Sequence, residues 1–220
     1  DLAVELTING AFTGLSGQAC TATSRAVVLD EVHDEYVDRL LERVESLTVG
    51  HPLEEGSDLG PKSSADSLEG DLEYVEIGES EGATLRTGGS RIEDGEFAGG
   101  HYIEPAVFTD VEPDMRIAQE EIFGPVLSVI EVADFEEALA VANDTPFGLS
   151  AGICTGSLKH ASHFKRNAQA GMVMVNLPTA GVDYHVPFGG RKGSSLGPRE
   201  QGRYAAEFYT TVKTSYTLPV

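Results

Sequence analysis

The chain has 220 residues and a formal net charge of -21, from 36 acidic and 15 basic residues. A surface this acidic repels phosphate groups and argues against nucleic acids and anionic membranes as partners, and the chain contains no run of about 18 apolar residues that could span a bilayer. Apolar residues make up 40% of the chain, which is enough for one good core. Because the acids are spread along the chain, we interpret them as the solvation surface of a halophile's protein, with an acidic mesophilic protein as the alternative.

The apolar periodicity predicts secondary structure along most of the chain. In order, the first half predicts a helix over 2–13, a strand over 25–29, an amphipathic helix ending near Gly50, a helix over 66–80, a strand over 83–87 and a glycine-rich loop over 94–100. The second half predicts a strand over 126–132, a helix from Phe135 to 143–146, a strand over 149–154, a helix over 157–169 and a strand over 172–176. Alternation of strands and helices predicts an α/β fold, a three-layer sandwich with a largely parallel sheet.

The C-terminal segment has a different pattern. Pro198 occupies the position of a first-turn proline, which predicts a helix running to about Tyr209. Residues 211–218 then alternate like an exposed strand. Since nothing nearby in the sequence can pair with that strand, we expect it to pair across a subunit boundary in a homo-oligomer.

The two cysteines, Cys20 and Cys154, are too few for a disulfide framework and fit a reducing cytosol, so we expect a cytoplasmic protein. The chain starts without Met, and its first residues resemble no secretion signal, which suggests a fragment. Cys154 ends an apolar run that predicts a buried strand and a structural thiol. Cys20 lies in a loop of small and polar residues, where a packing role is the simplest interpretation of the thiol taken alone.

Five motifs follow one another along the chain. They are G-Q-A-C-T-A at 17–22, E-E-I-F-G-P-V at 120–126, N-D-T-P-F-G-L at 143–149, G-M-V-M-V-N at 171–176 and P-F-G-G-R-K-G-S-S-L-G at 187–197. Together and in this order they resemble the aldehyde dehydrogenase superfamily. Ser195 stands where the family has Gly, which puts a local turn in doubt. Residues 184–187 and 198–204 look most like the branch that acts on 2-oxoglutarate semialdehyde (2,5-dioxopentanoate).

The resemblance implies that Cys20 is the catalytic nucleophile. In this family a thiolate adds to the aldehyde carbon, the resulting thiohemiacetal releases a hydride to NAD or NADP, and water hydrolyses the thioester to the acid. The backbone N–H of Cys20 is then one donor to the oxyanion. The implied substrate is a small aldehyde.

The resemblance also implies roles for other residues. Glu121 matches the position that holds the ribose hydroxyls and Phe123 the one that packs on the nicotinamide, against the simpler alternatives of a capping acid and a core aromatic. Thr179, Val182 and His185 match a substrate-tunnel wall. The Asn143 side chain and the 187–190 turn are expected to brace the site. The other histidines have no metal-ligand spacing and are expected at the surface: His33, His51, His101, His160 and His163.

The resemblance divides the chain into a catalytic domain over 1–197 and a C-terminal helix and oligomerisation strand over 198–220. The nucleotide-binding domain, the family's general-base Glu and its oxyanion-hole Asn would all precede Asp1. We therefore expect a competent thiol but no NAD(P)-dependent turnover from the isolated chain. Two alternatives stay open: a non-catalytic oligomerisation or binding module, and an enzyme whose thioester passes to CoA or phosphate.

Overall fold

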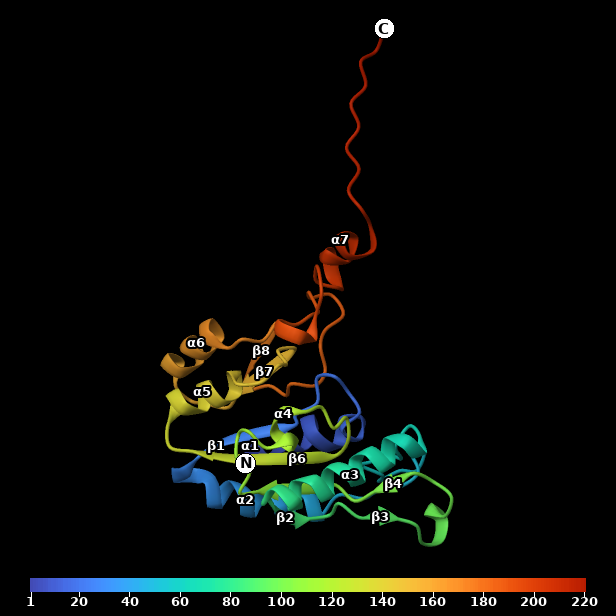
Figure 1. The fold of residues 1–220 in the computed structure, drawn as a ribbon, viewed down its shortest axis with the longest axis vertical. Helices are drawn as coiled ribbons and strands as arrows, with labels where there is room; N and C mark the ends of the chain where they lie inside the picture. The colour runs from blue at the N-terminus through green and yellow to red at the C-terminus, as the bar shows by residue number, and fades with distance from the viewer.

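The computed structural model describes residues 1–220 apart from the side chain of Glu96, and Figure 1 shows the arrangement of its elements. The first half contains α1 (Leu2–Ile8), a π-helical turn (Asn9–Thr13), a 3-10 turn (Leu15–Gly17), β1 (Arg25–Leu29), α2 (Asp30–Glu45), α3 (Ala65–Glu81), β2 (Thr84–Thr87), β3 (Arg91–Ile92), a 3-10 turn (Gly95–Phe97), β4 (Tyr102–Ile103) and β5 (Ala106–Thr109). The second half contains α4 (Arg116–Gln119), β6 (Val126–Val132), α5 (Phe135–Asn143), β7 (Ser150–Ile153), α6 (Leu158–Asn167), β8 (Met172–Val175), 3-10 turns (Lys192–Ser194 and Gly202–Tyr204) and α7 (Ala205–Tyr209).

The central sheet has four strands in the order β1-β6-β5-β2. β6 pairs in parallel with both β1 and β5, whereas β2 is antiparallel to β5. β7 and β8 form a separate parallel pair, and β3 and β4 an antiparallel one. The prediction of an α/β fold with a largely parallel sheet is confirmed.

Helices cover both faces of the central sheet, which gives the predicted three layers. α1 and α2 pack on one face, where Leu127 and Val129 of β6 are buried. α3, α4 and α5 pack on the other face, over Val126 and Ile130 of the same strand. Because β6 is buried on both sides, its sequence is mostly apolar rather than alternating, with Ser128 and the exposed Glu131 as the two polar residues.

Side-chain caps explain where three of the helices begin. The Ser64 hydroxyl accepts a hydrogen bond from the Ser67 N–H at the start of α3. Asp134 and Ser157 cap α5 and α6 in the same way. These caps satisfy N–H groups that have no partner within the first helical turn.

The prediction for the C-terminal helix is wrong in its start. Pro198 lies outside any helix, and the α-helical part is only α7, which begins at Ala205. Gln201 has a left-handed φ of 65°, which breaks any continuous helix from Pro198. Residues 211–220 are all exposed and unpaired within the described chain, extending away from the body in Figure 1. Their pairing across subunits stays a prediction, as does the division at residue 197.

The prediction of a buried Cys154 is also wrong. Cys154 is exposed and follows β7, which is only half-buried because it belongs to a two-stranded sheet. The surface prediction holds for His51 and His163, whereas the other three predicted surface histidines are half-buried: His33, His101 and His160. Among the described residues, no helix combines the length and apolar character that crossing a bilayer needs.

Candidate active site

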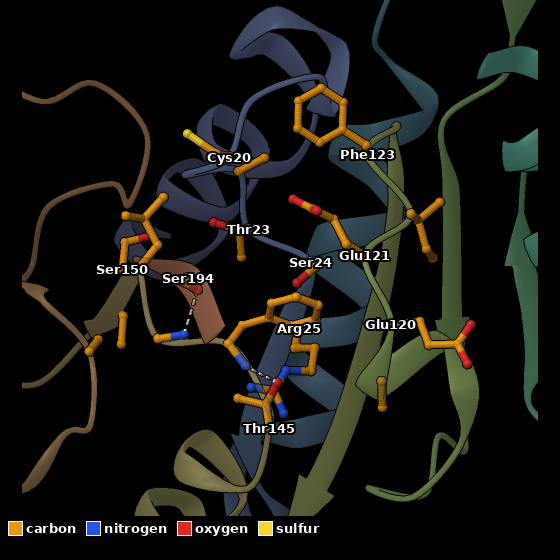
Figure 2. Close-up of a pocket in the computed structure, with 18 of the residues that line it drawn as sticks. Cys20, Thr23, Ser24, Arg25, Glu120, Glu121, Phe123, Thr145, Ser150 and Ser194 are labelled. Carbon is orange, nitrogen blue, oxygen red and sulfur yellow. Dashed lines mark hydrogen bonds between the residues drawn. The ribbon is translucent and has the colours of Figure 1, made fainter. Parts of the chain in front are cut away.

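A pocket of about 380 Å³ gathers residues from parts of the chain that are far apart in sequence. Cys20, Glu121 and Phe123 all line it, and Figure 2 shows the sulfur, the carboxylate and the ring around the same end of the pocket. The fold therefore brings together the three residues for which the motifs predict catalytic and cofactor roles.

The loop before Cys20 (the Cys20 loop) has an unusual backbone. Leu15, Ser16 and Gly17 have left-handed φ angles of 63°, 53° and 69°. A Cβ on Gly17 would lie 2.2 Å from the Gly124 carbonyl oxygen, so only glycine fits there. This close approach joins the Cys20 loop to the loop that carries Phe123.

The Cys20 side chain is presented to solvent. The residue is exposed and lies in a turn closed by a hydrogen bond from the Ala22 N–H to the Ala19 carbonyl, at 2.9 Å. No acceptor among the described residues takes the Cys20 N–H. The loop thus offers an open sulfur and an uncommitted backbone donor next to it.

Phe123 and Glu121 present complementary chemistry in the pocket. The Phe123 residue is 44% exposed although its side chain is large and apolar, and its φ is 63°. Glu121 is also exposed. An open aromatic face can pack on a planar ring, and a carboxylate can accept hydrogen bonds from a pair of hydroxyls, so the two residues fit a nicotinamide riboside.

The wall opposite is the C-terminal end of α5, whose carbonyls are held by cations. The Arg25 guanidinium donates to the carbonyls of Val141 and Ala142 at 3.2 and 3.3 Å. Lys192 donates to the Thr145 carbonyl at 3.1 Å. Burial lowers the pKa of Arg25. These donors satisfy carbonyls that have no partner within the helix. Their positive charges are also stabilised by the negative end of the helix dipole.

The bracing role predicted for Asn143 agrees with its contacts. Its amide donates to the Asn167 carbonyl at 3.1 Å, and its oxygen accepts the Gln169 N–H at 2.7 Å. The doubt about Ser195 is resolved, because its φ of -155° is an ordinary extended value and its hydroxyl accepts the Gly190 N–H at 2.7 Å.

The predicted substrate-tunnel residues lie elsewhere. The Thr179 hydroxyl is 2.8 Å from that of Thr23, and Thr179 lines a second groove of about 410 Å³ between β1 and β7. Val182 and His185 line neither cavity, and the exposed His185 ring lies against Tyr184, with 5.4 Å between centroids. Their roles in substrate binding stay a prediction.

Sequence reasoning missed a buried ion pair beside the Phe123 loop. The Lys62 Nζ lies 2.8 Å from an Asp71 carboxylate oxygen, and both side chains are 1% exposed. Lys62 lies in a polar stretch that predicts a surface position. Asp71 lies on the same helical face as Leu68 and Val75, which is a local sign of burial, but nothing in the sequence marks Lys62 as its partner.

A family model described as the aldehyde dehydrogenase family matches residues 1–215. The chain belongs to this family. The alpha-ketoglutarate semialdehyde dehydrogenase of Haloferax volcanii is 51% identical over 97% of the chain, and the 2,5-dioxopentanoate dehydrogenase of Saccharolobus solfataricus is 43% identical over 98%. The chain spans 44% of the length of each, so it corresponds to less than half of these curated relatives.

Solved structures of the family share the fold. Betaine aldehyde dehydrogenase from Staphylococcus aureus, in complex with NAD+, superposes with a TM-score of 0.91 at 31% identity, covering 94% of this chain and 41% of that one. A 1-pyrroline-5-carboxylate dehydrogenase from Thermus with bound NAD superposes at 0.81 with 45% identity, covering 87% of this chain and 36% of that one.

Proposed function

We propose that this chain carries the nucleophile of an NAD(P)-dependent aldehyde dehydrogenase that converts an aldehyde to a carboxylic acid. The observation that supports it most is the exposed Cys20 thiol in the same pocket as the open Phe123 ring and the Glu121 carboxylate. In a family with members solved in complex with NAD, this set matches a nucleophile beside a surface on which the nicotinamide can pack.

In the proposed reaction the Cys20 thiolate forms a C–S bond to the aldehyde carbon, and the carbonyl oxygen becomes an oxyanion that the Cys20 N–H can stabilise. NAD or NADP, when bound, accepts the hydride that leaves this carbon. Cys20 then holds the acyl group as a thioester, and hydrolysis releases the acid and restores the thiol. Glu121 orients the ribose and Phe123 supports the nicotinamide face.

We propose 2-oxoglutarate semialdehyde as the substrate class. Relatives named for this substrate match almost the whole chain, at 51% identity for the Haloferax protein and 44% for one from Bacillus subtilis. Thr179, Val182 and His185 are proposed to contact the aldehyde, with Thr179 linked to the Cys20 loop through Thr23.

The proposal is tested by thiol protection, which needs no cofactor. Because both cysteines are exposed, the starting variant is Cys154→Ser, which leaves Cys20 as the single thiol. We expect iodoacetamide to alkylate this thiol, and a small aldehyde to slow the alkylation by forming a reversible thiohemiacetal. The anionic 2-oxoglutarate semialdehyde should protect at lower concentration than the cationic betaine aldehyde.

The matched control is Cys20→Ser, which leaves Cys154. Although the Cys154 residue is exposed, its neighbours partly desolvate the sulfur and so raise the pKa of the thiol. Its reactive thiolate fraction is therefore reduced at neutral pH, and we expect slow alkylation without aldehyde protection. Equal rates for the two thiols, or no protection of Cys20 by any aldehyde, would overturn the proposed function in favour of a binding or oligomerisation module.

We further propose that the protein is cytoplasmic, homo-oligomeric and adapted to high salt. The charge of -21 and the 51% identity to a Haloferax protein support the salt adaptation. Since the Debye length falls from about 10 Å at 0.1 M salt to about 3 Å at 1 M, added KCl should relieve the repulsion between acids and raise the melting temperature. A melting temperature that stays level or falls toward molar KCl contradicts this adaptation.

A further inference from the structure

Lys62 and Asp71 form a buried ion pair whose desolvation costs free energy, and the proposed chemistry does not use either side chain directly. Both side chains are 1% exposed, and removing two charges from water costs free energy that their attraction only partly returns. The 2.8 Å approach lacks hydrogen-bond angles, so neither Asp71 oxygen has a hydrogen-bond partner in the described part of the chain. Burial lowers the pKa of Lys62 and raises the pKa of Asp71, and each partner opposes the other's shift.

The Lys62 ammonium donates a hydrogen bond to the loop that carries Phe123. Its Nζ donates to the Phe123 carbonyl at 2.6 Å. Phe123 has a left-handed φ of 63°, a conformation that a bulky residue holds only when its surroundings impose it. Asp71 closes the other side, because a Cβ on Gly124 would lie 2.1 Å from its carboxylate. The pair therefore contacts the backbone of Phe123 and Gly124 from two sides, and this backbone sets the direction of the Phe123 ring.

The segment that carries Lys62 is also hydrogen-bonded to the Cys20 loop. The Gln18 side-chain amide donates to the Pro61 carbonyl at 3.1 Å, and its oxygen accepts the Ser63 N–H at 2.8 Å. Gln18 lies two positions before Cys20 in sequence. Lys62, between these two contacts, thus connects the loop that presents the sulfur to the loop that presents the ring.

We propose that Lys62, neutralised by Asp71, is a positioning residue that sets the Phe123 ring relative to the Cys20 sulfur. The functional meaning rests on the proposed function, in which Phe123 supports the nicotinamide face and Cys20 attacks the aldehyde. The physical part, that Lys62 orders the Phe123 loop, stands on the contacts alone. Without Lys62 the Phe123 carbonyl loses its donor, and the left-handed turn relaxes.

The chain contains no tryptophan, so Phe123→Trp introduces a single fluorescent reporter at the loop. In this background we expect Lys62→Met to lower the tryptophan anisotropy and to increase acrylamide quenching. Loss of a hydrogen bond from a charged donor should raise the population of released loop conformers at least about tenfold. The matched control is Arg39→Met, which removes the cation of an exposed ion pair on α2 and should leave both signals unchanged.

A second variant separates positioning from stability. Lys62→Met alone leaves a lone buried carboxylate and should lower the melting temperature, whereas Lys62→Met with Asp71→Leu replaces the whole pair by apolar side chains and should restore it. We expect the double variant to keep the low anisotropy, because the Phe123 carbonyl still lacks its donor. An anisotropy that recovers with the melting temperature, or that never falls in Lys62→Met, overturns the positioning role.

The two proposals fail in different ways. If aldehydes do not protect Cys20 but the tryptophan anisotropy of Phe123→Trp depends on Lys62, the proposed function fails and the positioning role of Lys62 is supported. If aldehydes protect Cys20 but the anisotropy does not change with Lys62→Met, the proposed function is supported and the positioning role fails.

Discussion

The Cys20 segment at 15–24 and the C-terminal segment at 210–220 differ in the contacts that hold them in place. The first is made of small and polar residues, yet its left-handed backbone packs against Gly124 and is tied by Gln18 to residues 61–63. The second contains large apolar residues, with Val212 97% and Tyr216 95% exposed, and contacts no strand of its own chain.

The difference separates two sources of order. Residues 15–24 keep a strained conformation because surrounding elements over-determine it, as strained functional loops require. Residues 210–220 have a strand-like pattern, but a strand needs a neighbour to take its backbone hydrogen bonds. Its order is therefore expected to come from another chain.

The largest expected effect breaks the first region at Gly17. Gly17→Ala adds a Cβ 2.2 Å from the Gly124 oxygen at a residue with φ of 69°, and we expect a loss of about 3 kcal/mol in the free energy of unfolding. The control is Gly56→Ala, where φ is 95° but nothing lies within 4 Å, so only the backbone penalty of about 1–2 kcal/mol remains. Urea titrations compare the two, and equal losses would mean that the contact with Gly124 is not tight.

A second prediction concerns the contact between α1, which precedes the Cys20 segment in the chain, and α2. The Tyr36 hydroxyl of α2 lies 2.7 Å from that of Thr7 in α1, and burial raises the pKa of Tyr36 to about 12. The folded protein thus holds the phenolic proton more tightly than the unfolded chain. This contribution is complete below about pH 10 and is lost as the pH rises through 12, a total change of about 3 kcal/mol.

The measurement is the free energy of unfolding between pH 9 and 12, taken as the difference between the wild-type chain and Tyr36→Phe. The variant lacks the titrating phenol, so the difference between the two should shrink across this interval. A constant difference would show that Tyr36 ionises as readily in the folded chain as in the unfolded one.

The smallest effect on stability is expected at the other region. Deletion of 211–220 removes only residues that are exposed in the single chain, so the free energy of unfolding should change by less than about 0.5 kcal/mol when both proteins are compared at concentrations low enough to be monomeric. The same deletion should convert oligomers to monomers in size exclusion. An unchanged elution volume from an oligomeric parent contradicts a role for this segment in assembly.

Much of the fold could be read from sequence because periodicity reports burial. The limits of β6 were predicted to the residue, since it is a mostly apolar run between polar segments, and those of α3 to within one residue at each end, since its apolar residues recur at helical spacing. β5, with only four residues, and the two-residue strands β3 and β4 were missed, because such short segments carry no period. The Cys154 prediction failed because an apolar run does not tell a central strand from one in a two-stranded sheet.

By itself, the sequence determined the family and the layers of the fold and predicted Cys20 as the nucleophile, since motifs and apolar periods are local properties of the chain. Only the tertiary structure decided that Cys20, Glu121 and Phe123 share one pocket, and that Lys62 and Asp71 meet in the interior beside them. The physical reason is that burial of a charge depends on neighbours supplied by other segments, and the sequence around Lys62 does not show which residues those neighbours are.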